Sequence, residues 1–259
     1  MPKDRFRRLV NSAVPAVPPL PLTHVTDAYY FEDARLVDEL RPSDCKVFGE
    51  PLLYLFYGRP SYRVNPDEEP SGLGHYLPVC ILLRAGGMAA PKRVFPFDSG
   101  AFAAGRYKAA MHRAMKLDDF SLETDPNTPE RVITLFFGSV EDYFIANPTT
   151  HPSLPATQFE AQSYAALIQS KLPSAIDDRG SAIELQMDVP VRLSTFAEAV
   201  VAPGPILDVL DVMAFLNAHG IEPIPYDQLG RQRPSDLVSN IFHICRDYYR
   251  RRGLLPSPA

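Results

Sequence analysis

Short apolar runs, most of them bounded by prolines, alternate with polar segments along this chain. The chain has 27 prolines and no tryptophan, and the prolines separate the apolar runs more often than they interrupt long helical patterns. Nearly continuous apolar or aromatic stretches of this length are typical of strands covered on both faces. The pattern predicts strands at residues 52–57, 76–83, 93–97, 132–137, 183–189, 199–201 and 222–226.

Helical spacing of apolar residues is less frequent. Asp27 is a candidate N-terminal cap for the first helical segment, and Gly220 and Gly253 are candidate C-terminal stops. Because strands and helices intersperse without a regular βαβ alternation, we predict an α+β fold with peripheral helices around a sheet. The predicted helices lie at residues 31–40, 157–172, 205–218 and 234–252.

The length of the chain favours one domain. With 259 residues and 46% hydrophobic residues, the chain can bury one sizeable core, and length alone requires no second domain. We predict an irregular, proline-broken N-terminal arm at residues 1–21 and a single domain at residues 22–259. Residues 196–259 are expected to form a βαβα appendage packed on that core, unless the segment simply completes the core itself.

Charge and cysteine usage indicate a cytoplasmic protein. The 26 basic and 31 acidic side chains give a net charge of −5, so no broad attraction to nucleic acid or anionic membranes is expected. The basic residues do cluster at the two ends, at residues 3–8 and 246–252, where we interpret them as solvated charge. Three cysteines lie far apart, which suits a reducing compartment. No apolar run approaches the roughly 18 residues that would span a membrane.

Several common catalytic motifs are absent. The sequence has neither GxxxxGK[ST] nor a GxGxxG after a predicted strand, so a P-loop and a Rossmann phosphate cradle are both excluded. The six histidines are scattered without HExxH spacing, and we expect no metal site. The GxSxG elbow of hydrolases is also missing.

The predicted strand at residues 52–57 belongs to an aromatic segment that is a candidate ligand site. Residues 51–63 contain Tyr54, Tyr57 and Tyr62 and a Gly-Arg-Pro turn at Arg59. Tyrosine rings can stack on nicotinamide or adenine, and a guanidinium can bind pyrophosphate with two hydrogen bonds. An aromatic core strand followed by a solvated turn explains the same pattern equally well.

The remaining candidate residues lie near strand ends. His24 lies in a short alternating segment before Asp27, where a neutral imidazole can hydrogen-bond a ribose hydroxyl or, more often, a backbone carbonyl. Asp98 most simply closes the turn of Asp98-Ser99-Gly100 through its own backbone. Glu184 stands at the head of an apolar strand, where a carboxylate is costly unless other groups hold it.

The order of these segments resembles the DNA-targeting ADP-ribosyltransferase toxins of the DarT family. The matching positions are His24 with Thr26, then residues 51–62 with Arg59, then residues 97–101, and finally residues 184–190. The resemblance extends over about 170 residues with similar order and spacing. The sequence departs from the family pattern at Tyr57-Gly58 before the arginine and at Ile183 before the glutamate, and residues 151–180 contain no clear counterpart of the family's nucleic-acid loop.

This resemblance implies a fold, a substrate and site residues. The fold is an ADP-ribosyltransferase-like split sheet with mixed or antiparallel strands, and the substrate is NAD. Glu184 would stabilise the oxocarbenium-like state at the nicotinamide ribose, and Arg59 would contact phosphate or assist the acceptor. His24 and Thr26 would hold the ribose and the amide, and Tyr54, Tyr57 or Tyr62 would stack on a ring.

The acceptor and the biological role are expectations of the same resemblance. Arginine-modifying transferases carry Glu or Gln two residues before the catalytic glutamate, whereas this chain has Ala182. A nucleobase of DNA or RNA is therefore expected ahead of a protein side chain or water, in a toxin or phage-defence role with a possible macrodomain-type antitoxin. The alternatives are an NAD glycohydrolase and a non-catalytic module that senses NAD or a nucleotide, or docks a partner, within a defence system.

Overall fold

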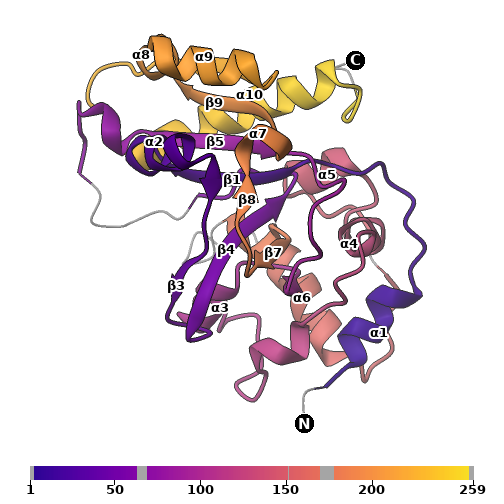
Figure 1. Ribbon diagram of the computed structural model, residues 1–259. Coiled ribbons are helices and arrows are strands. Elements are labelled where there is room, and N and C mark those ends of the chain that lie inside the picture. Colours follow the sequence, from indigo (N-terminus) through magenta and orange to yellow (C-terminus); the bar gives the residue numbers. More distant parts are fainter. Residues whose placement is uncertain (1–2, 63–68, 151, 170–177, 257–259) are drawn as a thin grey trace.

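The computed structural model describes residues 3–62, 69–150, 152–169 and 178–256 (Figure 1). All predicted strands except the one at residues 132–137 are found, with ends shifted by a few residues. The strands are β1 (Leu22–Asp27), β2 (Glu39–Leu40), β3 (Ser43–Cys45), β4 (Glu50–Tyr57), β5 (Pro78–Leu83), β6 (Arg93–Phe95), β7 (Glu184–Met187), β8 (Val191–Arg192), β9 (Ala197–Pro203) and β10 (Glu222–Tyr226).

Helices surround these strands (Figure 1). Within the described residues, none is long and apolar enough to serve as a membrane span. The α-helices are α1 (Arg5–Ser12), α2 (Ala28–Val37), α3 (Ser99–Ala103), α4 (Thr128–Phe136), α5 (Val140–Phe144), α6 (Phe159–Gln169), α7 (Leu193–Phe196), α8 (Gly204–Leu207), α9 (Leu210–Ala218) and α10 (Val238–Arg251). The short 3-10 helices are η1 (Gly74–Tyr76), η2 (Leu117–Phe120), η3 (Asp178–Ser181) and η4 (Pro234–Leu237).

Most of the strands form one mixed sheet. Its strands follow the order β10-β9-β5-β1-β4-β7-β6, with β3 paired to β4, and a small second sheet joins β2 to β8. Only β9 and β10 run parallel; the other pairs of the main sheet are antiparallel. All six residues of β5 are buried, as expected for a continuous apolar strand between two neighbours. The predicted α+β class, with a mixed sheet and peripheral helices, is confirmed.

The C-terminal segment contributes strands to the main sheet. Residues 196–259 contain the predicted order of strand, helix, strand and helix, and β9 pairs with the central strand β5 over Cys80 to Leu83. α10 begins after η4 and buries Ile241, Cys245 and Tyr248 on one face. Figure 1 places α8, α9 and α10 around β9 at one end of the sheet.

The N-terminal segment differs from expectation. Residues 5–12 form α1, so the prediction of an irregular arm is wrong for this stretch. The reason is a pair of apolar residues four positions apart, Phe6 and Val10, which a helix places on one face and which are both fully buried here. Phe6 packs against Phe120 and Tyr164, with ring centroids 5.7 and 5.6 Å apart.

The predicted strand at residues 132–137 is also wrong, because these residues belong to α4 and the turn after it. Val132, Ile133 and Phe136 recur at helical rather than alternating spacing, and all three are buried. Pro129 stands in the first turn of α4, where its missing N–H costs nothing. The segment is buried, as its apolar content indicates, but its apolar residues follow the period of a helix and not that of a strand.

We expect Phe6→Ala to lower the free energy of unfolding by about 3 to 5 kcal/mol, because it removes a buried ring from the contact between α1, α4 and α6. Chemical denaturation of full-length protein measures this loss. Val14→Ala, at a side chain that is 76% exposed, is the matched control and should change stability little. Equal stabilities of the two variants would contradict the packing of α1.

Candidate functional site

The sheet forks between β1 and β4. These strands share only two registered pairs, Leu22 with Tyr57 and Thr23 with Phe56. Beyond Thr23, β1 continues to pair with β5 as far as Asp27 and Pro78, while β4 continues along β7 as far as Leu53 and Met187. Figure 1 shows β1 and β4 crossing at a steep angle and separating from this point. The fork places residues of both strands beside each other without a continuous ladder between them.

His24 occupies the start of the fork. Its Nδ1 lies 2.9 Å from the Tyr54 carbonyl oxygen, which accepts the hydrogen bond, so Nδ1 carries the proton. Burial lowers the pKa of His24 below its ordinary value, more than the hydrogen bond to Tyr54 raises it. The imidazole is therefore neutral at pH 7, and its Nε2 is an acceptor for a hydroxyl or amide hydrogen.

Glu184 begins β7 on the other side of β4. It pairs with Phe56 of β4 and Phe95 of β6, and its side chain is only 1% exposed. One carboxyl oxygen accepts from the Ser99 backbone N–H at 3.0 Å. The other accepts from the Ser99 hydroxyl and from the Gln186 amide, both at 2.7 Å. These contacts hold the carboxyl group in an apolar strand where an unpaired one would be too costly.

The environment of Glu184 favours its protonated form. Burial is the main cause and the charge of Asp98 adds to it, and together they raise the pKa of Glu184 to about 8 against the hydrogen bonds from Ser99 and Gln186. Asp98 itself caps α3 by accepting from the Ala101 N–H at 2.7 Å and pairs with Arg179 at 3.1 Å. The interpretation of Asp98 as a turn-closing residue is thus confirmed. A carboxyl that titrates near neutral pH is typical of catalytic sites.

Tyr54 connects the two sides of the fork. It pairs with Gln186, so its side chain leaves the sheet on the same face as those of Gln186 and Glu184. Its hydroxyl lies 2.7 Å from the Cys45 sulfur in β3. Burial raises the pKa of Tyr54, followed by the hydrogen bond with Cys45 and by the charge of Glu184. Tyr54 thus contacts His24 through its backbone, and its ring lies within range of the Glu184 charge. By register, the His24 side chain leaves the sheet on the face of Tyr57, opposite Glu184.

Arg59 and Tyr57 lie at the other end of β4. The Arg59 guanidinium is buried, donates to the Ser181 hydroxyl, and lies 5.8 and 5.7 Å from the ring centroids of Tyr143 and Phe242. Tyr57 donates to Glu130 at 2.6 Å and projects to the face opposite Glu184, since it neighbours Phe56 along the strand. In this structure both side chains are internal and neither lines the fork.

The turn before Arg59 has little freedom. Gly58 has φ +66°, and a Cβ at this position would collide with the side chain of Leu20. The Thr23 hydroxyl donates to the Arg59 carbonyl at 2.6 Å, which ties the turn back to β1 at the base of the fork. Arg59 thus positions residues 181–184 through Ser181.

Thr26 and Tyr62 complete the set expected from the sequence. Thr26 lies two residues beyond His24 on β1, opposite Val79, and is half-buried. It shares the strand face of His24. Tyr62 is half-buried at the end of the described segment 3–62. The structure places Thr26, His24 and Tyr54 on the two strands of the fork, whereas Glu184 lies on β7, on the other side of β4.

Ser99 and Gln186 are contacts of Glu184 that the sequence reasoning missed. Gln186 lies two residues after Glu184 and therefore on the same face of the strand, which the alternation of a strand could have indicated. Ser99 comes from a distant segment, and its place in an Asp-Ser-Gly turn gave no sign of a contact with Glu184. No local pattern links positions 85 residues apart.

Within the described ranges, no three His, Cys, Asp or Glu side chains gather in a way that could hold a metal ion. A cavity of the described chain lies against α6 and includes none of the fork residues. Comparison with protein-family models, curated proteins and solved structures finds no match for this chain.

We expect Glu184→Gln to remove a pH dependence of stability. The native state holds a proton at Glu184 up to about pH 8, whereas the unfolded chain releases it near 4.5. The stabilising effect is therefore full below pH 4.5 and is lost as the pH rises through 8, by up to about 1.4 kcal/mol per pH unit. Urea denaturation at several pH values should show the wild type losing stability relative to Glu184→Gln across this range.

Glu69→Gln, at an exposed carboxyl, controls for the loss of one acidic side chain in this comparison. If wild type and Glu184→Gln kept a constant difference in stability from pH 5 to 8, the buried, protonated state of Glu184 would be disproved.

Proposed function

We propose that this protein is an NAD-dependent ADP-ribosyltransferase whose reaction takes place at the fork between β1 and β4. The observation that carries the proposal is the joint position of His24, Tyr54 and Glu184 on three neighbouring strands. An acceptor imidazole, an aromatic ring and a titratable carboxyl are the groups that a nicotinamide riboside needs. The resemblance of these segments to the DarT family points to the same chemistry.

The proposed reaction begins with heterolysis of the bond between the nicotinamide nitrogen and the ribose C1′, whose electron pair leaves with nicotinamide. The Glu184 carboxylate accepts a hydrogen bond from the ribose 2′-hydroxyl and stabilises the positive charge that develops at C1′. His24 Nε2 accepts from a ribose hydroxyl, and Tyr54 borders the nicotinamide ring. The acceptor then attacks C1′ with a lone pair, and its proton passes to water.

Substrate binding must replace some of the internal contacts of Glu184. Ser99 and Gln186 occupy both carboxyl oxygens in the structure, so the 2′-hydroxyl takes the place of one of these donors. A charged carboxylate is also better stabilised once the oxocarbenium-like state lies beside it. Ser99 and Gln186 therefore position the carboxyl group before NAD arrives.

We propose a nucleobase as the acceptor. This part of the proposal is supported by the resemblance to the DarT family and by the alanine at position 182. Ala182 is 1% exposed and directly precedes Ile183 and Glu184, so no side chain at this position can orient a guanidinium. A toxin or phage-defence role, with an antitoxin that reverses the modification, is part of the same proposal.

One observation favours a non-catalytic module that binds NAD or a nucleotide. Glu184 is almost completely buried and its oxygens are satisfied within the chain, which is also what a purely structural carboxyl requires. The two functions differ in what they consume, because only the transferase breaks the nicotinamide bond.

Glu184→Gln should lower NAD consumption by at least about 100-fold, because it removes the charge that stabilises the transition state. Release of nicotinamide, followed by chromatography, measures the rate in purified protein. Glu123→Gln, at a half-exposed carboxyl, is the control and should retain wild-type activity. Wild-type protein that leaves NAD intact, with and without oligonucleotides, would exclude the enzyme and favour the binding module.

The acceptor is tested by incubating the protein with NAD, DNA and RNA oligonucleotides and cell lysate, followed by mass spectrometry. We expect an oligonucleotide to gain the mass of ADP-ribose. Unmodified oligonucleotides together with a labelled protein, or with free ADP-ribose, would refute the nucleobase while leaving the NAD chemistry in place.

The rate should also depend on pH through Glu184. Because the ionised carboxylate is the active form and the pKa is raised to about 8, kcat/KM for NAD should increase as the pH rises from 6 through 8. Burial lowers the pKa of His24 below its ordinary value, so His24 titrates at lower pH than Glu184 and does not account for an increase near pH 8. A profile that is flat between pH 6 and 9 would contradict the role of Glu184.

A further inference from the structure

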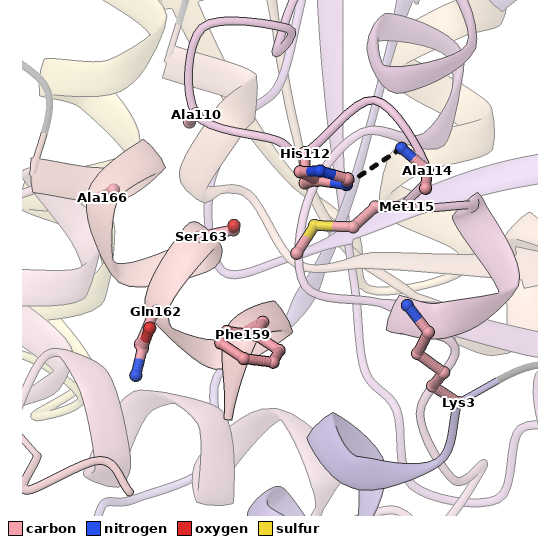
Figure 2. Close-up of a pocket in the computed structure, with 9 residues that line it drawn as sticks. All are labelled: Lys3, Ala110, His112, Ala114, Met115, Phe159, Gln162, Ser163 and Ala166. Carbon is pink, nitrogen blue, oxygen red and sulfur yellow. Dashed lines mark hydrogen bonds between the residues drawn. The ribbon is translucent and has the colours of Figure 1, made fainter. Parts of the chain in front are cut away.

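A cavity of about 580 Å³ lies between α6 and the loop of residues 104–116, and none of the fork residues lines it (Figure 2). Its size lies within the range of about 300 to 1,000 Å³ that small-molecule sites occupy. Phe159, Gln162, Ser163 and Ala166 form one wall, and Met115 and His112 form the facing wall. Lys3 stands at the edge, as Figure 2 shows.

The α6 wall is one continuous helix face. Its residues recur at positions i, i+3, i+4 and i+7, so their side chains project in the same direction. The opposite face of α6 supplies the core, where Tyr164 packs against Phe6, Phe97 and Phe136. Packing of the core therefore does not account for the aromatic and polar side chains on the cavity face.

This wall combines a stacking surface with hydrogen-bonding groups. The Phe159 ring is 49% exposed, and the Arg5 guanidinium lies 5.2 Å from its centroid. The Gln162 amide nitrogen donates to the Pro155 carbonyl at 3.1 Å, which leaves its oxygen as an acceptor. Ser163 adds a hydroxyl that can donate or accept. A flat ring with polar edges satisfies all of these groups, whereas an acyl chain would leave the amide and hydroxyl unpaired.

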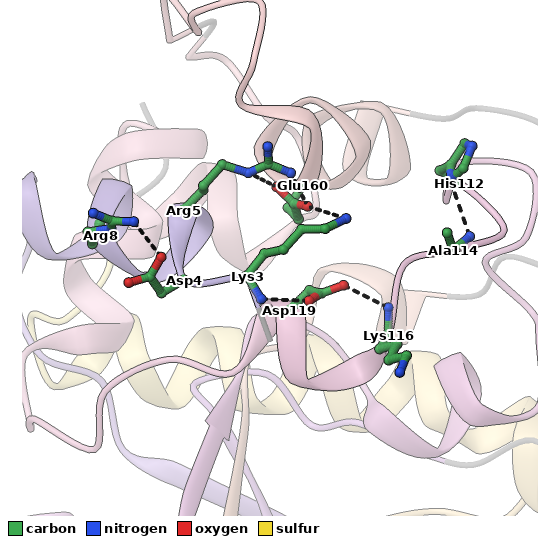
Figure 3. A network of polar contacts seen from close by, with 9 residues as sticks. All are labelled: Lys3, Asp4, Arg5, Arg8, His112, Ala114, Lys116, Asp119 and Glu160. Carbon is green, nitrogen blue, oxygen red and sulfur yellow. Dashed lines mark hydrogen bonds and ion pairs between the residues drawn. The ribbon is translucent and has the colours of Figure 1, made fainter. Parts of the chain in front are cut away.

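The surroundings of the cavity are positively charged. Glu160 is buried and accepts two hydrogen bonds from Arg5, and the same carboxylate lies 3.6 Å from the Lys3 ammonium (Figure 3). Asp119 accepts from the Lys3 backbone N–H at 2.8 Å and adds a second negative charge to this cluster, so the excess of positive charge comes from the loop. The 104–116 loop carries four Lys or Arg residues and no acidic residue, in a chain of net charge −5.

His112 adds a donor on the wall that faces α6. Its Nδ1 accepts from the Ala114 N–H at 3.2 Å, so the proton of the neutral ring lies on Nε2 (Figure 3). Together with the Lys3 ammonium, this donor suits an anionic group of a ligand.

We propose that this cavity binds one nucleotide unit, either a free mononucleotide or one residue of a single-stranded nucleic acid. The base lies on Phe159 with its polar edge toward Gln162 and Ser163, and the phosphate lies near Lys3, His112 and the basic loop. Stacking on an exposed aromatic ring beside cationic side chains is how proteins bind single nucleotides of flexible strands. The site is separate from the fork and does not require the proposed reaction.

The test is calorimetric titration of the full-length protein with adenosine monophosphate, with a single-stranded oligodeoxyadenylate of about eight nucleotides, and with inorganic phosphate. Ala166→Phe fills the cavity and Lys3→Gln removes its cation. The matched controls are Ala214→Phe, at an exposed alanine within α9, and Lys46→Gln, at an exposed lysine between β3 and β4.

We expect both cavity variants to weaken nucleotide binding by about tenfold or more and both controls to retain wild-type affinity. An oligonucleotide that binds much more tightly than the mononucleotide, with the same sensitivity, identifies a strand as the source; equal affinities identify the free nucleotide. Phosphate binding as tight as that of the mononucleotide, or unchanged affinity in Ala166→Phe, overturns the proposal. Thermal melting of each variant verifies folding, and NAD consumption by Ala166→Phe reports separately on the fork.

Discussion

The structure around the fork depends on holding the Glu184 carboxyl inside an apolar sheet. Its three donors come from β7 itself and from the turn that opens α3, so the carboxyl fixes the position of α3 against the strand. Asp98 strengthens this arrangement by capping α3 and pairing with Arg179, which precedes β7. The same arrangement brings a second carboxylate close to Glu184 and so makes it easier to protonate.

β4 connects the strand that carries Glu184 to the rest of the sheet. It pairs with β7 along one side and with β1 over only two residues on the other, and it meets β3 through Cys45 and Tyr54. Because β1 separates from β4 early, the Tyr54 carbonyl accepts from His24. In a continuous ladder, a backbone N–H of β1 would donate to this carbonyl instead. The Thr23 hydroxyl donates to the Arg59 carbonyl, and the Arg59 guanidinium donates to Ser181. These contacts hold β1 and the end of β4 together at the base of the fork.

The two proposed sites are linked by chain connectivity. α3, which presents Ser99 to Glu184, continues directly into the basic loop that forms one wall of the cavity. α6 forms the other wall, and its buried face contacts Phe97, which immediately precedes Asp98. A ligand in the cavity therefore contacts segments that also support Glu184, although its own contacts lie on the outer face of α6.

The sequence by itself determined the α+β class, the six longer or apolar strands β4, β5, β6, β7, β9 and β10, the cap at Asp27 and the unusual status of Glu184, because each depends on local period or on the cost of one buried charge. It misjudged residues 5–12 and 132–137, where short apolar spacings fit two periods and only contacts with distant helices decide between them. Tertiary structure alone decided that Ser99 holds Glu184, that His24 bonds to Tyr54 and that Arg59 and Tyr57 turn inward. These outcomes depend on strand register and on contacts between segments that are far apart in the chain. A local sequence pattern determines neither of them.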